Sequence, residues 1–173
     1  MYGTNFIRIN SQINNYSIER ISKTINVTPA NALFKFAFIS VFATGHTCCD
    51  GGAIQVLLMN ATTNSLIACP TFTNGAPSLQ CTNSNTSVPY FNINTGTPYT
   101  GTGSIIFNKW NVNTFDLSPY MGQNITIQVI ATDCTAGGHY GYVYFDASCG
   151  AQTFTVNGTN NGGGSYTICN PVF

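Results

Sequence analysis

The side chains able to do acid–base chemistry are few, and none of them is placed like the catalytic group of a hydrolase. The complete set of carboxylates is Glu19, Asp50, Asp116, Asp133 and Asp146. Glycoside hydrolysis needs two carboxylates facing one substrate. If a turn at 135–138 joins a hairpin, Asp133 and Asp146 lie roughly 20 Å apart along the strand. Neither histidine lies beside a G-x-S-x-G elbow. We therefore expect that the protein is not an enzyme.

Two loops contain residues that could hold a metal ion. The loop at 44–52 and the turn at 133–139 meet if Cys134 forms a disulfide with Cys48 or Cys49. That pairing would bring together four ligand-type residues, namely His46, Asp50, Asp133 and His139. Two Asp carboxylates with loop carbonyls suit Ca²⁺, and two His with an Asp suit Zn²⁺. The alternative is that both histidines hydrogen-bond the loop backbone and brace the disulfide.

The seven cysteines are scattered and form no C-x-x-C pair, which argues against a zinc ribbon or a thioredoxin-type site. Scattered cysteines in a charge-poor chain predict disulfides and an oxidising compartment. Besides the pairing of Cys134, we expect Cys69 with Cys81, and Cys149 can pair with Cys169 if the tail folds back. A bond between Cys134 and Cys149 is disfavoured, since a hairpin would place them at opposite ends of one strand.

An alternating run of aromatic residues is the best candidate for ligand contact. Tyr140, Tyr142 and Tyr144 share one face of a strand, while Val143 and Phe145 share the other. Sandwich strands usually bury aromatics, so the two sets compete for the inner face. If Val143 and Phe145 occupy it, the tyrosines form an outward row on which sugar rings can stack.

For several other residues the sequence suggests either contact with a ligand or a role in the fold. Tyr90 and Tyr99, in the long segment 73–103, are alternative contact residues. Trp110 is expected in the core, and Asp116 is expected to cap the turn that begins at Ser118-Pro119. The glycines at 137, 138 and 141 predict a tight turn and close strand packing.

Composition limits the partners. Charged residues make up 6% of the chain, against roughly 25% in an ordinary domain, and the net charge is zero. Binding of nucleic acid or of an anionic membrane surface needs clustered Lys and Arg, which the chain does not have. The chain contains no run of about 18 apolar residues, so its sequence predicts no membrane-spanning helix.

The polar positions are mostly Asn, Thr, Ser and Gly, which favour strands and turns. We expect strands at 33–42, 53–59, 104–110, 111–117, 124–131 and 140–146, two short strands within 8–27, and a hairpin partner for 53–59 at 65–72. Segment 73–103 is expected to be irregular. Many short strands separated by turns predict an all-β fold. We assign residues 1–152 to a jelly-roll β-sandwich of two antiparallel sheets, stabilised by disulfides, and 153–173 to a hairpin or linker.

Five stretches carry a resemblance to a known group of domains, and two of them are 19–22 and 27–34. Residues 110–127 begin with a Trp and continue through Asp-Leu-Ser-Pro-Tyr-Met-Gly into an alternating strand, as in carbohydrate-binding and MAM-like sandwiches. Residues 133–149, and upstream Gly45-His46-x-Cys48-Cys49-Asp50, resemble a domain of large bacterial surface adhesins, including gliding-motility-type proteins. The resemblance covers about residues 5 to 150 and implies a jelly-roll fold with an adhesive or display role.

The leading expectation is an extracellular recognition module, part of a longer secreted protein, that binds a cell-surface glycan or glycoprotein. The alternative is a structural spacer or assembly domain of a surface fibre, for which a homo-oligomer is an attractive setting. Near-identical tandem copies in the parent gene would favour the spacer, and a single copy with divergent loops would favour recognition.

Overall fold

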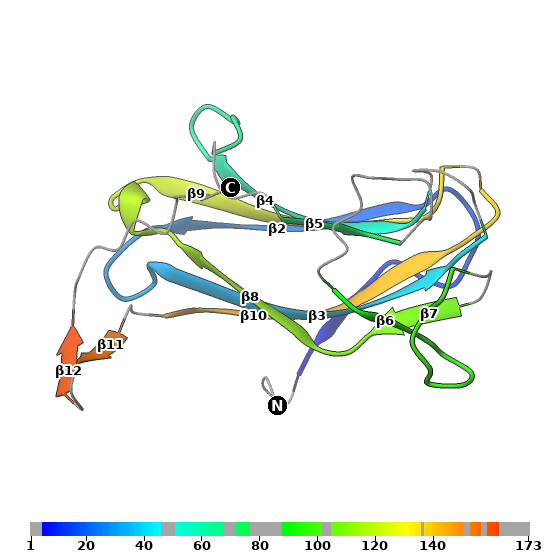
Figure 1. The fold of residues 1–173 in the computed structure, drawn as a ribbon. Coiled ribbons are helices and arrows are strands. Elements are labelled where there is room, and N and C mark those ends of the chain that lie inside the picture. The colour runs from blue at the N-terminus through cyan, green and yellow to red at the C-terminus, as the bar shows by residue number, and fades with distance from the viewer. Residues whose placement is uncertain are drawn as a thin grey trace, which may run out of the picture.

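Two antiparallel sheets lie face to face in a computed structural model of the chain (Figure 1). It describes residues 5–45, 51–67, 72–76, 88–101, 105–135 and 137–150, and the backbone of 153–156 and 159–162. The all-β architecture with two antiparallel sheets confirms the predicted fold class at that level. Within the described ranges no helix is both long and apolar enough to cross a membrane.

The first sheet has six strands in the order β1-β10-β3-β7-β6, and β8 also pairs with β3. Its strands are β1 (Ile7–Ile9), β3 (Leu33–Ala43), β6 (Tyr90–Asn92), β7 (Ile105–Asn108), β8 (Asn111–Asp116) and β10 (Gly141–Gly150). The second sheet has the order β2-β9-β4-β5, with β2 (Ile18–Asn26), β4 (Ala53–Asn60), β5 (Phe72–Gly75) and β9 (Asn124–Thr132). A short 3-10 helix, η1 (Ser118–Tyr120), precedes β9, and β11 (Thr153–Val156) pairs with β12 (Thr159–Gly162).

The core lies between the two sheets and is built by strand alternation. On β9, Ile125, Ile127, Val129 and Ala131 are buried, as their spacing predicts. They face the aromatic inner side of β3, whose buried rings are Phe34, Phe36, Phe38 and Phe42. These rings pack against one another and against neighbouring strands, with centroids 5.6 Å apart for both Phe34–Phe36 and Phe36–Phe145. Aromatic packing of this kind contributes beyond the buried area alone.

The connection from β9 to β10 is not the hairpin that its turn signal predicted. β9 pairs with β2 and β4 in one sheet, whereas β10 pairs with β1 and β3 in the other. Residues 133–140 therefore cross from sheet to sheet at one end of the sandwich (Figure 1). The glycines act as predicted: a Cβ at Gly141 would lie 2.7 Å from the Thr132 carbonyl oxygen, and Gly137 has a φ of +72°.

Two other predictions are refined by the pairing around β4. On its edge away from β9, β4 pairs with β5 at 72–75, and the predicted hairpin partner is seen at 65–67, where Met59 bridges to Leu66 and the Ile67 amide donates to the Leu58 carbonyl. The segment 73–103 is also less irregular than predicted, because it contains most of β5 and all of β6. In both cases the pairing is made between strands distant in sequence, which local turn signals do not report.

Asp133 anchors the crossing between the sheets. Its carboxylate is buried and accepts three hydrogen bonds, from Asn10 Nδ2 (3.0 Å), the Gly141 amide (2.9 Å) and the Ser17 amide (3.1 Å). These donors come from the loop between β1 and β2 and from the start of β10. A buried carboxylate is tolerated because such donors replace its water. One side chain thus ties together three segments from the two sheets.

Replacing Asp133 with Ala should destabilise the fold by about 3 kcal/mol, because two buried N–H groups and one partly buried N–H group lose their acceptor. Urea unfolding of both proteins measures the difference. The control is Asp146→Ala at a half-buried position on β10, expected to cost less than about 1 kcal/mol. Equal losses for the two variants would contradict the anchoring role.

Candidate functional site

Tyr142 and Tyr144 of β10 lie on the outer face of the first sheet, and Tyr140, just before β10, stacks on Tyr142. Val143 and Phe145 belong to the core cluster between the sheets, so the alternation turns Tyr142 and Tyr144 the other way. In the register with β3, Tyr142 pairs with Val41 and Tyr144 with Ile39. Val143 and Phe145 therefore occupy the inner face of the sheet, and the tyrosines do not.

These tyrosines continue into a longer line of rings. The Tyr140 and Tyr142 rings are stacked with centroids 6.1 Å apart, and Tyr142 meets Tyr144 edge-on at 5.6 Å. Tyr144 in turn meets Phe6 at 5.3 Å, and Phe6 meets Trp110 at 6.4 Å. We call this set the aromatic row: Phe6, Trp110, Tyr140, Tyr142 and Tyr144.

Exposure differs along the aromatic row. Phe6 is 59% exposed and Trp110 is 42% exposed, whereas Tyr142 is only 6% exposed beneath its neighbours. Tyr140 and Tyr144 are half-buried. A ligand would therefore contact Phe6, Trp110 and Tyr144 first, while Tyr142 supports the surface from below.

Polar groups border the aromatic row. The Arg8 guanidinium lies 5.9 Å from the centre of the Tyr142 ring, and Gln12 Nε2 donates a 3.3 Å hydrogen bond to the Tyr142 hydroxyl. Burial, and to a smaller degree the neighbouring Tyr142, raise the pKa of the Tyr140 phenol, so its hydroxyl remains a neutral donor and acceptor. Rings beside adaptable donors and acceptors form a surface with both apolar and hydrogen-bonding capacity.

Sequence reasoning placed Trp110 in the core, and it missed Phe6. Trp110 lies between the end of β7 and the start of β8, outside both strands, so no strand alternation turns it inward. Phe6 precedes β1, where Ile9 is buried and Arg8 lies on the outer face. The alternation of Phe6, Ile7, Arg8 and Ile9 was a signal in the sequence that would have placed Phe6 outward.

The other two predicted contact residues are not part of this face. Tyr90 is buried between the sheets, where its hydroxyl bonds to Ser40 Oγ (3.0 Å) and to the Asn74 side-chain amide. Burial raises the pKa of Tyr90 well above the ordinary value, despite opposing hydrogen bonds from Ser40 and Asn74. Tyr99 packs on the edge of the core, and its amide donates to the Tyr90 carbonyl.

The predicted metal site is described only in part. His46 and Asp50 lie outside the described residues, as do Cys48, Cys49, Cys69, Cys81 and Cys169. The imidazole of His139 lies against Gly45, and the His139 backbone amide donates to Cys134 Sγ at 3.3 Å. Both Asp133 oxygens accept hydrogen bonds from the protein. Among the described residues, no three His, Cys, Asp or Glu side chains cluster as a metal site.

The described carboxylates have structural partners in three of four cases. Asp116 Oδ1 accepts from the Ser118 amide at 2.8 Å, which confirms its role in the turn. Glu19 and Asp133 converge on Asn10, where Glu19 Oε2 accepts from the Asn10 amide at 2.7 Å. Asp146 is five residues along β10 from Gly141, which contacts Asp133, so about 17 Å of strand separates them.

The structure defines a β-sandwich whose first sheet has an aromatic outer face beside Arg8 and Gln12. Comparison of the chain with protein-family models, with curated proteins and with solved structures gives no match.

The burial of Tyr90 predicts a pH effect on stability. The unfolded chain ionises this phenol near its ordinary pKa of 10.0, whereas the folded protein keeps it protonated. The stability contributed by Tyr90 is therefore fully present below pH 10 and is lost as the pH rises above that value. Between pH 10 and 12, the wild type should lose up to about 1.4 kcal/mol per pH unit more than Tyr90→Phe. Urea unfolding at several alkaline pH values measures this, and parallel curves would contradict it.

Proposed function

We propose that this protein is an extracellular recognition module that binds a glycan through the aromatic row. The observation that carries the proposal is the unbroken line of ring contacts from Tyr140 to Trp110 on the outer face of a sheet. The C–H faces of sugar rings are apolar, so they can stack on exposed aromatic rings. The finer fold assignment, a jelly-roll domain of a secreted surface protein stabilised by disulfides, is part of this proposal.

In the proposed site, aromatic rings make the apolar contacts with the glycan and polar side chains make the hydrogen bonds. Phe6 and Trp110 offer the exposed apolar surface, and rigid aromatic side chains lose little conformational entropy on binding. Arg8 and Gln12, already engaged with Tyr142, are near enough to meet sugar hydroxyls. A line of contacts, instead of a closed pocket, favours an extended glycan chain over a single monosaccharide.

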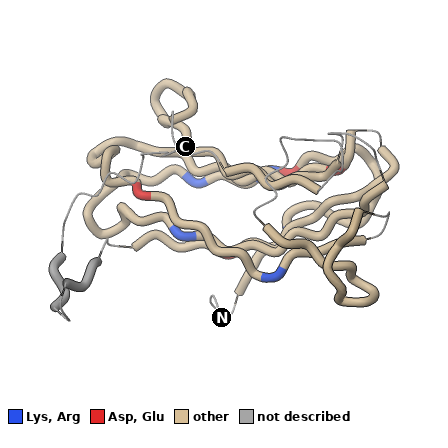
Figure 2. The backbone as a smooth tube through the Cα atoms, viewed as in Figure 1, with Lys and Arg blue, Asp and Glu red and all other residues tan. Residues whose placement is uncertain are grey.

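The low charge of the surface supports a neutral ligand. The described Lys, Arg, Asp and Glu positions are scattered along both sheets, with no cluster of one sign (Figure 2). Steering of a charged partner depends on a summed field of one sign, which this surface does not supply. Contact on the aromatic row must therefore come from stacking and hydrogen bonding.

The second candidate function is assembly within a surface fibre. It is favoured by the exposure of Val112 on β8, 37%, in the same sheet as the exposed Phe6 and Trp110. Contiguous apolar surface of this kind is typical of protein–protein contacts as well as of ligand sites. In this reading a second copy or another fibre subunit covers the aromatic row.

Trp110→Ala should weaken glycan binding about 10- to 30-fold, because truncating an aromatic anchor costs about 2 kcal/mol. A glycan array selects the ligand, and titration calorimetry measures Kd. Met121→Ala is the matched control, since Met121 is also 42% exposed but lies beyond the far end of β8. Phe6→Ala should repeat the effect of Trp110→Ala. If the folded protein gives no hits on the array and forms oligomers as its concentration rises, the proposed function is assembly in a fibre and not glycan binding.

Binding should survive EDTA, because the proposed contacts are rings and hydrogen-bonding side chains. The array is repeated in EDTA with the oxidised protein. Loss of the hits would instead assign recognition to a Ca²⁺ or Zn²⁺ site at the end that holds His46, Asp50, Asp133 and His139.

A further inference from the structure

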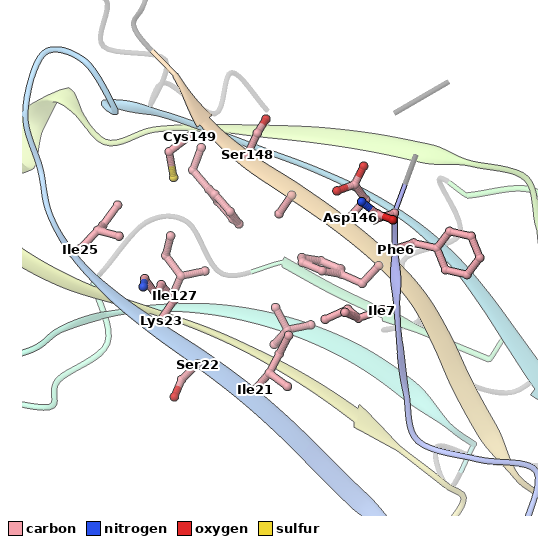
Figure 3. Close-up of a pocket in the computed structure, with 15 residues that line it drawn as sticks. Phe6, Ile7, Ile21, Ser22, Lys23, Ile25, Ile127, Asp146, Ser148 and Cys149 are labelled. Atoms are coloured by element: carbon pink, nitrogen blue, oxygen red, sulfur yellow. The ribbon is translucent and has the colours of Figure 1, made fainter. Parts of the chain in front are cut away.

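A slot enters the sandwich from one long side, between the two sheets. It has a volume of about 450 Å³ and lies between β2, at the edge of the second sheet, and the last residues of β10 in the first sheet (Figure 3). Binding sites for small ligands typically have volumes of about 300 to 1,000 Å³. The slot is therefore large enough to hold a small molecule between the sheets.

The floor of the slot is part of the apolar core. Four buried side chains form it, namely Phe34, Ile127, Val129 and Phe145. Inward-facing residues nearer the mouth remain in water. Ile21 of β2 is 39% exposed, and Ala147 of β10 is exposed although its register partner Phe36 is buried. A ligand with an apolar body would remove these groups from water, which favours binding through the hydrophobic effect.

The outline of the slot suits an unbranched chain. β2 and β10 run along its two sides (Figure 3). The lining residues extend over 21–25 on β2 and over 145–149 on β10, which is about 13 Å of strand on each side. An unbranched hydrocarbon chain can lie along both strands over this length and contact both walls, whereas a compact ring would contact only part of them.

Lys23 adds a positive charge to this apolar site, and no other Lys or Arg is among the described residues that line the slot. Lys23 pairs in register with the buried Ile127, so it belongs to the inner face of β2. No carboxylate in the described part of the chain forms an ion pair with it. Asp146 also borders the slot, but strand alternation assigns it to the outer face of β10. The ammonium group of Lys23 is thus available to a negatively charged ligand.

The position of Lys23 argues against a strand of another chain as the occupant. β2 is an edge strand, and within the described ranges its side away from β9 pairs with no strand. An inward-pointing charge on an edge strand hinders pairing with another chain, because the added strand would bury that charge. A small molecule that carries its own negative charge meets no such penalty. The lysine therefore favours a charged small ligand over a second protein chain.

We propose that the slot binds a free fatty acid, that is, an unbranched hydrocarbon chain ending in a carboxylate. The carboxylate lies at the mouth with the Lys23 ammonium group, and the chain lies in the slot against Ile21, Ile127 and Phe145. The inference goes beyond the proposed glycan recognition, because it concerns the space between the sheets. Phe6 is the one member of the aromatic row that also lines the slot, so it is not used in the test.

Titration with decanoate, followed by NMR of the isotope-labelled protein, tests the proposal. We expect one saturable site, with shift changes at residues 21–25 and 145–149. Decanol has the same chain without the charge and is the matched ligand. Lys23→Met should weaken decanoate binding about three- to fivefold at low salt, the scale of an exposed ion pair, and should change decanol binding less than about 1.5-fold. Asp146→Asn is the charge control and should bind decanoate at least as tightly as the wild type.

Two variants separate the slot from the aromatic row. Ala147→Phe fills the slot from an exposed position on β10 and should abolish binding of both ligands in a protein that still unfolds cooperatively. Trp110→Ala should bind decanoate like the wild type, since Trp110 does not line the slot.

Several results would overturn the proposal. They are a lack of saturable decanoate binding, shift changes confined to the aromatic row, and retained binding in folded Ala147→Phe. Equal losses for decanoate and decanol in Lys23→Met, or weaker decanoate binding in Asp146→Asn, would overturn the pairing of the carboxylate with Lys23. Dimers that form without ligand, with shift changes along 18–26 on dilution, would assign the slot to a second copy of the chain.

Discussion

The strand β3 is the element on which the rest of the structure depends. Its inner face carries Phe34, Phe36, Phe38 and Phe42, which fill the space against the aliphatic face of β9. Its edges pair with β10 on one side and with β7 and β8 on the other. Since successive side chains of a strand point to opposite faces, burial of these rings also fixes which residues of its neighbours face outward.

The aromatic row follows from that constraint. Pairing of β10 with β3 in the register that buries Val143 and Phe145 turns Tyr142 and Tyr144 to the outer face, beside Val41 and Ile39. β1 then adds Arg8 to the same face through its pairing with Tyr144. In a chain with so few charges, a line of rings bordered by Arg8 and Gln12 is a surface on which stacking and hydrogen bonding, and not long-range charge, select the partner.

One end of the sandwich is tied together by hydrogen bonds, whereas one long side is open. Asp133 holds the crossing between the sheets by accepting three hydrogen bonds, from the loop between β1 and β2 and from the start of β10, which is why that carboxylate serves the fold. The side between β2 and β10 has no such tie among the described residues and leaves Ile21 and Cys149 accessible. An edge that is both apolar and unpaired is costly to leave in water.

The sequence by itself determined the strands and their faces. The alternation at 124–131 identified the buried side of β9, the run at 33–42 identified β3, and Asp116 was recognised as a turn cap, because each of these depends on neighbours within a few residues. Tertiary structure decided what pairs with what. A turn signal at 135–138 reads the same whether the chain forms a hairpin or crosses to another sheet, and only the pairing of β10 with β3 distinguishes them. Likewise, the outward Trp110, the contact of Phe6 with Tyr144 and the open slot beside Cys149 arise from strands distant in the chain, whose register is set by burial over the whole sandwich.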